Sequence, residues 1–190
     1  KNRVMMAPME NGMAALGTGE VTERIIKFFE KRAENNVALI MPGSIGVSPE
    51  GRGLPTQLSM YDESHVAGHK RLVDALHAKG TLVGAQIYHA GRQASEGITG
   101  LTPLAPSAMP CAILSNHPEE ITVAQMEEIK EKFVKSARWC VEAGYDLVEV
   151  HFAHGYLLHS FMSTHSNFRT DEFGGSFENR IKYPMDVLKA

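Results

Sequence analysis

Short apolar runs alternate along this chain with longer amphipathic stretches, and this alternation restricts the fold more than any other feature. The apolar runs are residues 4–9, 37–41, 81–88 and 146–151. Each run is consistent with a strand that is buried on both faces. The amphipathic stretches are residues 22–34, 62–78, 122–143 and a last one that begins after Ser176. A strand followed by a helix, four times over, predicts an α/β fold with a parallel sheet covered by helices.

Two of the expected helices have recognisable ends. Thr122 and Gln125 have the spacing of a capping box, and Gly144 suits the C-terminal stop of the same helix. Ser176 suits the N-cap of the last helix. We expect that helix to be kinked or interrupted near Pro184, because proline has no N–H to donate.

The composition excludes several classes of protein. Of the 190 residues, 43% are hydrophobic and 22% are charged, which suits a domain with a substantial core rather than a disordered or disulfide-stapled chain. The formal net charge is only −3, and the 19 Lys and Arg residues form no basic run. We therefore expect neither a nucleic acid nor an anionic membrane as a partner.

The cysteines and the apolar runs indicate a cytoplasmic location. Cys111 and Cys140 have no C-x-x-C spacing, which is ordinary for a reducing compartment. The longest apolar runs are far shorter than the roughly 20 residues of a membrane span, and no signal peptide is recognisable. The chain begins without Met and ends inside an expected helix, so we interpret it as part of a longer protein.

Two connections are unusually long, and each follows the C-terminal end of an expected strand. Residues 89–121 contain four prolines and no helical period, whereas residues 152–175 are rich in His, Ser, Thr and Gly. Parallel α/β folds build their sites at this end of the strands. We expect functional residues in both connections.

The sequence His151-Phe-Ala-His154-Gly-Tyr156 brings three polar rings just beyond the fourth expected strand. Two neutral imidazoles can donate hydrogen bonds to one carbonyl oxygen, and a phenol can supply a proton. A hydrogen-bonded pair of structural histidines with a packing tyrosine explains the same residues. A metal site is a third interpretation, but no third ligand stands at a recognisable spacing, so we expect no metal.

Polar or small residues also end the first and third expected strands. Gln86 has an amide that suits the edge of a heterocycle with N–H and C=O groups, and Arg92 supplies a cation nearby. Ala7 and Pro8 allow a flat ring to approach the backbone, because Pro8 cannot continue a strand ladder. A capped strand end and a strand that stops at proline are the plain alternatives.

The Gly-Gly-Ser sequence at 174–176 has only a superficial likeness to a phosphate cradle. Asp171, Glu172 and Glu178 surround it and no Lys follows, so an anion would be repelled. We interpret residues 169–180 as a structural loop held by ion pairs and turn glycines.

Four segments in order along the chain carry a resemblance to a known family. They are Asn2-Arg3-Val-Met-Met-Ala7-Pro8-Met9, Gln86-x-x-His89-x-Gly91-Arg92, Ala143-Gly144-Tyr-Asp146-x-Val-Glu149-Val-His151-x-Ala-His154-Gly155-Tyr156, and Asn167-x-Arg169-x-Asp171-x-Phe173-Gly174-Gly175-Ser176-x-x-Asn179-Arg180. Together they resemble the Old Yellow Enzyme family of flavin-dependent ene reductases. The Ala105-Pro106-Ser107-Ala108 stretch is most similar to the branch that contains 2,4-dienoyl-CoA reductases, enoate reductases and bile-acid ene reductases.

The resemblance implies an FMN-dependent (β/α)8 TIM barrel. Residues 1–190 would be its N-terminal half, roughly the first four βα units, with no internal domain boundary. In this branch the barrel is usually followed by [4Fe–4S] and FAD- and NAD(P)H-binding regions, of which the chain has no trace.

The resemblance also implies which residues bind the flavin. The expected residues are Ala7, Pro8, Met9, Glu10, Gly43 and Gln86. The backbone of the first three would lie along the ring, Gly43 would allow close approach, and Gln86 would bond the pyrimidine edge. Glu10 departs from the small hydroxyl or thiol residue of many relatives, and a carboxylate there disfavours an anionic reduced flavin unless it points away.

The catalytic residues that the resemblance implies are His151, His154 and Tyr156. The histidines would hold the carbonyl or carboxylate oxygen of an α,β-unsaturated carbonyl or enoyl substrate. Hydride would pass from flavin reduced by NAD(P)H to the β-carbon, and Tyr156 would protonate the α-carbon. A tyrosine with an ordinary pKa of about 10 stays protonated at neutral pH, as this role requires.

Two other functions stay open at this point. One is an amine dehydrogenase or oxidase of the same superfamily, and the other is a non-catalytic half-barrel. The phosphate site of such barrels commonly follows strands 7 and 8, so we expect the 190-residue chain alone to bind FMN weakly or not at all. Besides the small-molecule substrate, we expect a second copy of the chain as a partner.

Overall fold

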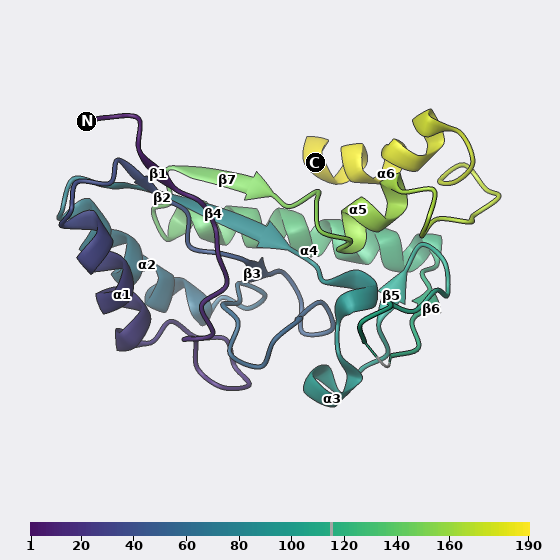
Figure 1. The fold of residues 1–190 in the computed structure, drawn as a ribbon, viewed down its shortest axis with the longest axis horizontal. Helices are drawn as coiled ribbons and strands as arrows, with labels where there is room; N and C mark the ends of the chain where they lie inside the picture. Colours follow the sequence, from purple (N-terminus) through teal and green to yellow (C-terminus); the bar gives the residue numbers. More distant parts are fainter. Residues whose placement is uncertain (115) are drawn as a thin grey trace. The chain divides into compact units, whose positions relative to one another are not determined.

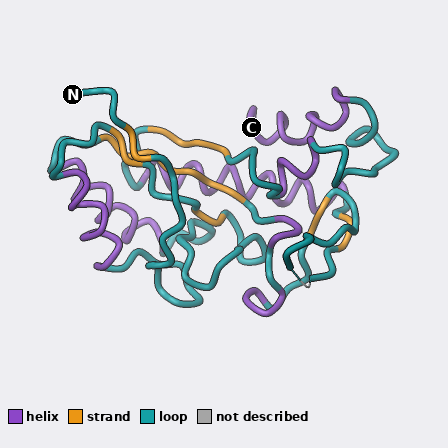
Figure 2. The backbone as a smooth tube through the Cα atoms, viewed as in Figure 1, coloured by secondary structure: helices purple, strands orange, loops and turns teal. Residues whose placement is uncertain are grey.

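The computed structural model describes residues 1–114 and 116–190, which form short strands and longer helices (Figures 1 and 2). The strands are β1 Met5–Met6, β2 Leu39–Ile40, β3 Ile45–Gly46, β4 Leu82–Tyr88, β5 Leu104–Ala105, β6 Glu119–Glu120 and β7 Leu147–Val150. The helices are α1 Glu23–Ala33, α2 His65–His77, the 3-10 helix η1 Gly91–Gln93, α3 Glu96–Thr99, α4 Val123–Glu142, α5 Leu157–Met162 and α6 Phe177–Lys189. The four expected strands are confirmed as β1, β2, β4 and β7, and the four expected helices as α1, α2, α4 and α6.

Side chains close the helix ends as the sequence predicts. The Thr122 N–H donates to Gln125 Oε1 over 2.9 Å, and the Gln125 N–H donates to Thr122 Oγ1 over 3.2 Å, which is a reciprocal capping box. Ser176 accepts from the Asn179 N–H at the start of α6. The helix α6 continues through Pro184, so the expected interruption is wrong, whereas a kink at this position remains a prediction. Pro184 and its neighbour Tyr183 are buried, so tertiary packing outweighs the one missing backbone hydrogen bond.

The two long connections contain more regular structure than expected. Residues 89–121 include η1, α3 and the parallel pair of β5 with β6, and residues 152–175 include α5. The two-residue strand β3 is a further addition. Elements of two to six residues are too short to show a hydrophobic period, so their sequences cannot be distinguished from those of loops.

The chain divides into two compact units, each built from three separate segments. Unit 1 consists of Lys1–Val47, Pro55–Ile87 and Lys135–Glu149, and unit 2 of Ser48–Leu54, Tyr88–Val134 and Val150–Ala190. We predicted one domain over residues 1–190 without an internal boundary, and this remains a prediction.

Unit 1 carries the parallel sheet. Its strand order is β1-β2-β4-β3, and β7 also pairs with β4. Met5 lies opposite Leu39, and Leu39 lies opposite Leu82, in parallel register. The helices α1 and α2 lie side by side next to these strands (Figure 1), and both bury apolar side chains such as Phe29 and Leu72. Burial of these side chains is the main stabilising contribution to the unit.

Unit 2 is centred on the packing of α5 against α6 (Figure 1). The rings of Phe161 and Tyr183 have centroids 4.7 Å apart, and the Tyr183 hydroxyl donates to the Met126 carbonyl over 3.0 Å. Both aromatic side chains are buried, and this contact joins α5 to α6.

The loop that follows α5 is structural, as interpreted from its sequence. The buried Arg169 side chain pairs with Asp171 at 2.5 Å and with Glu120 at 3.3 Å, and it donates to the Ile121 carbonyl at 2.8 Å. A Cβ added to Gly174 would lie 2.1 Å from the Arg169 carbonyl oxygen, so only glycine fits there. The Arg169 charge is therefore occupied in bonds within the loop and to the segment of Glu120 and Ile121.

Neither a membrane-spanning helix nor a metal-binding group of side chains is present among residues 1–114 and 116–190. No helix in this part of the chain is long and apolar enough to cross a membrane. Within the same ranges, no three His, Cys, Asp or Glu side chains are grouped so that they could hold a metal ion. The expectations of a cytoplasmic protein and of no metal remain predictions.

Candidate functional site

The expected site residues form two clusters, one in each unit. The first, called here the Gln86 cluster, lies in unit 1 and consists of Ala7, Pro8, Met9, Glu10, Gly43 and Gln86. The second, called here the His-Tyr cluster, lies in unit 2 and consists of His151, His154 and Tyr156.

Three neighbouring parallel strands assemble the Gln86 cluster. Ala7 and Pro8 directly follow β1, Gly43 lies three residues beyond β2, and Gln86 is near the end of β4. Because β1, β2 and β4 are adjacent and parallel, residues after their C-terminal ends meet at the same edge of the sheet.

Gly43 shows how closely this edge is packed. A Cβ added to Gly43 would lie 2.9 Å from Pro8 Cβ and 3.2 Å from Gln86 Cβ. These distances are shorter than ordinary van der Waals contact, so a side chain at this position would displace its neighbours. The sequence therefore places glycine where Pro8 and Gln86 need close approach.

Gln86 is held by a residue that the sequence analysis assigned no role. Gln86 is 9% exposed, and its Nε2 donates to Glu149 Oε1 of β7 over 2.5 Å. A primary amide has two N–H groups and one carbonyl oxygen, so this bond leaves one donor and the acceptor for a ligand. Glu149 lies two residues before His151, but nothing in its spacing signals a bond to a residue 63 positions away.

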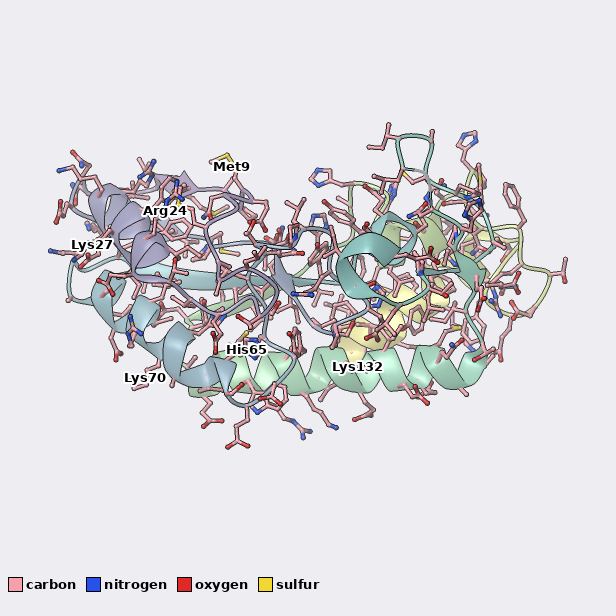
Figure 3. The ribbon with its side chains drawn as sticks, turned by 90° about the horizontal axis from the view of Figure 1, so that it is seen from below. Met9, Arg24, Lys27, His65, Lys70 and Lys132 are labelled. Atoms are coloured by element: carbon pink, nitrogen blue, oxygen red, sulfur yellow. The ribbon has the colours of Figure 1, made fainter. Side chains whose placement is uncertain are left out.

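The remaining members of the Gln86 cluster are accessible. Ala7 is exposed and Pro8 is half-buried. Met9 is 59% exposed, and its side chain projects away from the ribbon (Figure 3). The backbone beyond β1 is thus open to a ligand.

Glu10 turns its carboxylate toward its own loop. Its Oε1 accepts the N–H groups of Asn11 and Gly12, each over 2.9 Å. Desolvation raises the pKa of the Glu10 carboxyl above its usual value, and the two backbone donors oppose that effect. The two backbone hydrogen bonds and the raised pKa both reduce the repulsion between the Glu10 carboxylate and a neighbouring anion.

The predicted convergence of three polar rings in the His-Tyr cluster is confirmed. The ring centroid of His151 lies 5.0 Å from the centroid of His154 and 5.0 Å from that of Tyr156. The ring centroids of His154 and Tyr156 lie 6.2 Å apart. His151 follows the last residue of β7, and Tyr156 directly precedes α5. His154 has a φ of +59°, the left-handed conformation that lets the chain turn sharply between them.

Backbone groups fix the direction of His151 and the position of His154. His151 is buried, and its Nδ1 accepts the Ala153 N–H over 3.1 Å. The other ring nitrogen, Nε2, therefore carries the proton of the neutral imidazole and can donate it in a hydrogen bond. The exposed His154 is held through its carbonyl, which accepts from Gln93 Nε2 over 2.6 Å.

Tyr88 supports the cluster and was missed by the sequence analysis. Its ring meets the half-buried ring of Tyr156 edge to face, with centroids 4.8 Å apart. The Tyr88 hydroxyl accepts the Gly53 N–H over 3.1 Å. An aromatic residue two positions after Gln86 is the only signal in the sequence, and it is a weak one.

His89 lies outside this cluster of rings and has a structural role. Its Nδ1 accepts the Gly91 N–H over 3.0 Å, and its carbonyl accepts the Leu157 N–H over 3.0 Å at the start of α5. Burial lowers the pKa of His89 to about 4, against the opposing effect of the Glu50 carboxylate, so the imidazole is neutral at pH 7. Arg92 is half-buried, and its carbonyl accepts from the Asn116 side chain.

Comparison with known proteins decides the family. The model of the NADH:flavin oxidoreductase / NADH oxidase family matches residues 1–190. The chain belongs to this family. FMN and NAD(P)H are the cofactors of the family, and an Old Yellow Enzyme from Pichia sp. is among the similar structures, so the resemblance seen in the sequence is confirmed.

Similar family members are longer than this chain. A NADH oxidase of Thermoanaerobacter brockii is 41% identical over 191 residues, which cover 100% of this chain and 29% of the relative. The structure of the Pichia sp. Old Yellow Enzyme matches with a TM-score of 0.92 and 31% identity, over 100% of this chain and 52% of the other. A 2-naphthoyl-CoA reductase in complex with 2-naphthoyl-CoA matches with a TM-score of 0.94 and 31% identity, over 100% and 31%. This chain therefore has the fold of part of a (β/α)8 barrel, as predicted, and it covers 29% to 52% of these three relatives.

The Gln86 cluster of this family member fits a flavin ring. The missing Cβ of Gly43 lets Pro8 and Gln86 lie close together at the strand ends, and the Gln86 amide has a donor and an acceptor for a heterocycle edge. The cluster contains no Lys or Arg that would hold a phosphate. It therefore suits the ring of FMN rather than the phosphate group.

Proposed function

We propose that this chain is part of an FMN-dependent ene reductase that reduces the activated C=C bond of an α,β-unsaturated carbonyl compound or enoyl thioester. The observation that carries the proposal is the grouping of two imidazoles and one phenol, with centroids 5.0 to 6.2 Å apart, in a chain of a flavin oxidoreductase family. Bound FMN would supply the hydride for the β-carbon after its reduction by NAD(P)H.

The two histidines would bind and polarise the substrate. We assign the carbonyl oxygen of the substrate to the Nε2–H of His151 and a ring N–H of His154. Donors fixed before the substrate arrives stabilise the negative charge that develops on that oxygen, and removal of one such donor typically costs about 100-fold in rate. His151 is suited to this role because the Ala153 N–H fixes its tautomer.

Tyr156 would protonate the α-carbon. The proton of its hydroxyl goes to the α-carbon, the hydride goes to the β-carbon, and the C=C bond becomes a C–C single bond. The phenolate is then reprotonated from water. Tyr88 supports this role, because its edge-to-face contact restricts the ring of Tyr156.

The Gln86 cluster would hold the flavin ring. The roles proposed are backbone contact from Ala7, Pro8 and Met9, close approach at Gly43 and hydrogen bonds from Gln86 to the pyrimidine edge. The loop of Glu10 would border the ring, and its hydrogen bonds to Asn11 and Gly12 turn the charge toward the backbone.

The substrate class draws support from a similar protein. A 2-naphthoyl-CoA reductase has been captured with 2-naphthoyl-CoA, a thioester whose carbonyl is conjugated with a ring system. A thioester carbonyl offers the same oxygen acceptor to two imidazole donors as an enone does.

Reduction in D2O tests this function. The FMN-loaded full-length protein would receive NADH or NADPH with 2-cyclohexen-1-one or crotonyl-CoA, and the product would be examined by NMR. We expect a saturated product with deuterium at the α-carbon and hydrogen from the nicotinamide at the β-carbon. Flavin reduction by amines, with no loss of the C=C bond of either alkene, would instead support the amine dehydrogenase alternative.

A further inference from the structure

The contact between Gln86 and Glu149 joins two neighbouring strands of unit 1. Gln86 belongs to β4 and Glu149 to β7, and these strands pair with each other. Gln86 Nε2 donates to Glu149 Oε1 over 2.5 Å. Gln86 is 9% exposed, so this bond has a large influence on how its amide is oriented.

A hydrogen bond to a carboxylate breaks the symmetry of an amide. The two ends of a glutamine amide have nearly the same shape, so packing alone does not select its orientation. A carboxylate only accepts hydrogen bonds, so the NH2 end of Gln86 must face Glu149. The oxygen then lies on the other side, where Gln86 Oε1 would be 3.3 Å from a Cβ added to Gly43.

The flavin edge needs one of these two orientations. The pyrimidine edge of an isoalloxazine has one N–H between two carbonyl groups. An amide whose oxygen faces that N–H can also donate its second N–H to an adjacent carbonyl. A reversed amide would bring two donors together and lose both bonds, which is how a polar site rejects a wrong orientation.

We propose that Glu149 is a positioning residue that fixes the Gln86 amide with its oxygen toward the N–H of the flavin pyrimidine edge. This inference rests on the proposed binding of FMN at the Gln86 cluster. Glu149 acts through Gln86, so its effect on FMN depends on an amide being present at position 86. A plain link between β4 and β7 would instead act on stability alone.

A double-mutant cycle on FMN affinity separates these two roles. Apoprotein of the full-length protein would be titrated with FMN, with flavin fluorescence as the signal, for wild type, Glu149→Leu, Gln86→Leu and the double variant. Glu149→Gln keeps the size and the fold but lets the amide turn, because a glutamine can either donate or accept. Glu142→Gln, at the exposed last residue of α4, is the matched control.

We expect Glu149→Leu to weaken FMN binding about 10-fold, Gln86→Leu about 30-fold, and the double variant about 30-fold rather than about 300-fold. Glu149→Gln should weaken binding by about 3-fold, and it carries the test if Glu149→Leu does not fold. The inference is overturned if the losses of FMN affinity in the two single variants multiply in the double variant, or if the Glu149 variants bind FMN like wild type. Either result would leave the proposed function standing. A wild-type protein without affinity for FMN would reject the proposed function and the inference together.

Discussion

The ring of His151 meets the ring of Tyr156 edge to face, with centroids 5.0 Å apart and an interplanar angle of 79°. His151 directly follows β7 and Tyr156 directly precedes α5, so the four residues between them bring a hydrogen-bond donor and an acid together. The donor direction is set by the backbone, because Nδ1 of His151 is already bonded to the Ala153 N–H. The proposed chemistry depends on this local construction.

His154 is expected to contribute a hydrogen bond to the substrate oxygen. The variant His154→Leu should lower kcat/KM for 2-cyclohexen-1-one about 100-fold, because it removes one of two donors. His154→Asn should stay within about 10-fold of wild type, because asparagine keeps an N–H and tolerates the positive φ at this position. Steady-state kinetics measure both, with His117→Ala at an exposed position as the control. Equal losses in the Leu and Asn variants would contradict the donor role.

Gly43 should be intolerant of a single methyl group. In Gly43→Ala the new Cβ would approach Pro8 Cβ to 2.9 Å, so the edge of the Gln86 cluster must shift. We expect FMN affinity to fall about 10-fold, the equivalent of about 1.4 kcal/mol. The control is Gly97→Ala, where the nearest atom would be 3.7 Å away. Fluorescence titration with FMN compares the two, and an unchanged dissociation constant for Gly43→Ala would contradict the proposed role of Gly43 in the flavin site.

Acid should destabilise the protein through the buried His69. Burial lowers the pKa of His69 to about 4, against an ordinary value of 6.5 in the unfolded chain. Between pH 6.5 and pH 4 the unfolded chain binds a proton at His69 that the folded chain does not bind. The contribution of the neutral, buried His69 to the free energy of unfolding is therefore complete above about pH 6.5 and is lost as the pH falls toward 4. The size of this loss is about 3 kcal/mol.

Urea unfolding of the full-length protein between pH 7 and 4.5 measures this effect. His69→Gln keeps a donor for the Ser59 carbonyl and an acceptor for the Tyr145 hydroxyl, so it should reduce the pH dependence without abolishing the fold. His165→Gln, at an exposed position, should retain the full pH dependence. A His69→Gln protein with the same pH dependence as wild type would refute the assignment.

Arg169 is expected to matter for stability rather than for catalysis. The variant Arg169→Met leaves the carbonyls of Pro106 and Ile121 without their donor and removes the pairs with Asp171 and Glu120. We expect the free energy of unfolding to fall by about 2 kcal/mol, since both carboxylates are partly exposed and keep some solvation. Arg169→Lys should not recover this loss, because a single ammonium cannot span the four partners. An unfolding free energy like that of wild type would contradict the structural interpretation.

Features set by nearby residues could be predicted from the sequence. Thr122 and Gln125 are three positions apart, so their capping box follows from local geometry. His151, His154 and Tyr156 lie within six residues after a strand, so their grouping was predictable as well. The close approach at Gly43 entered through the family resemblance.

Features that depend on distant residues could not be predicted in this way. The hydrogen bond between Gln86 and Glu149 joins two residues that are 63 positions apart in the sequence. The hydrogen bond between Gly53 and Tyr88 joins two residues that are 35 positions apart. Each depends on the register of the folded chain, which no local pattern encodes. The pair of β5 with β6 has only two residues on each side, so it depends on backbone pairing rather than on side-chain periodicity.

The proton-donor role of Tyr156 is the central claim, and stopped-flow measurement of Tyr156→Phe in the full-length protein tests it most directly. The two half-reactions would be followed separately through flavin absorbance, with Tyr61→Phe, outside both clusters, as the control. We predict that reoxidation of the flavin by 2-cyclohexen-1-one slows by about 100-fold or more while reduction by NAD(P)H stays within about twofold of wild type. An equal loss in both half-reactions, or an unchanged rate of reoxidation, would contradict the role of Tyr156 as the acid.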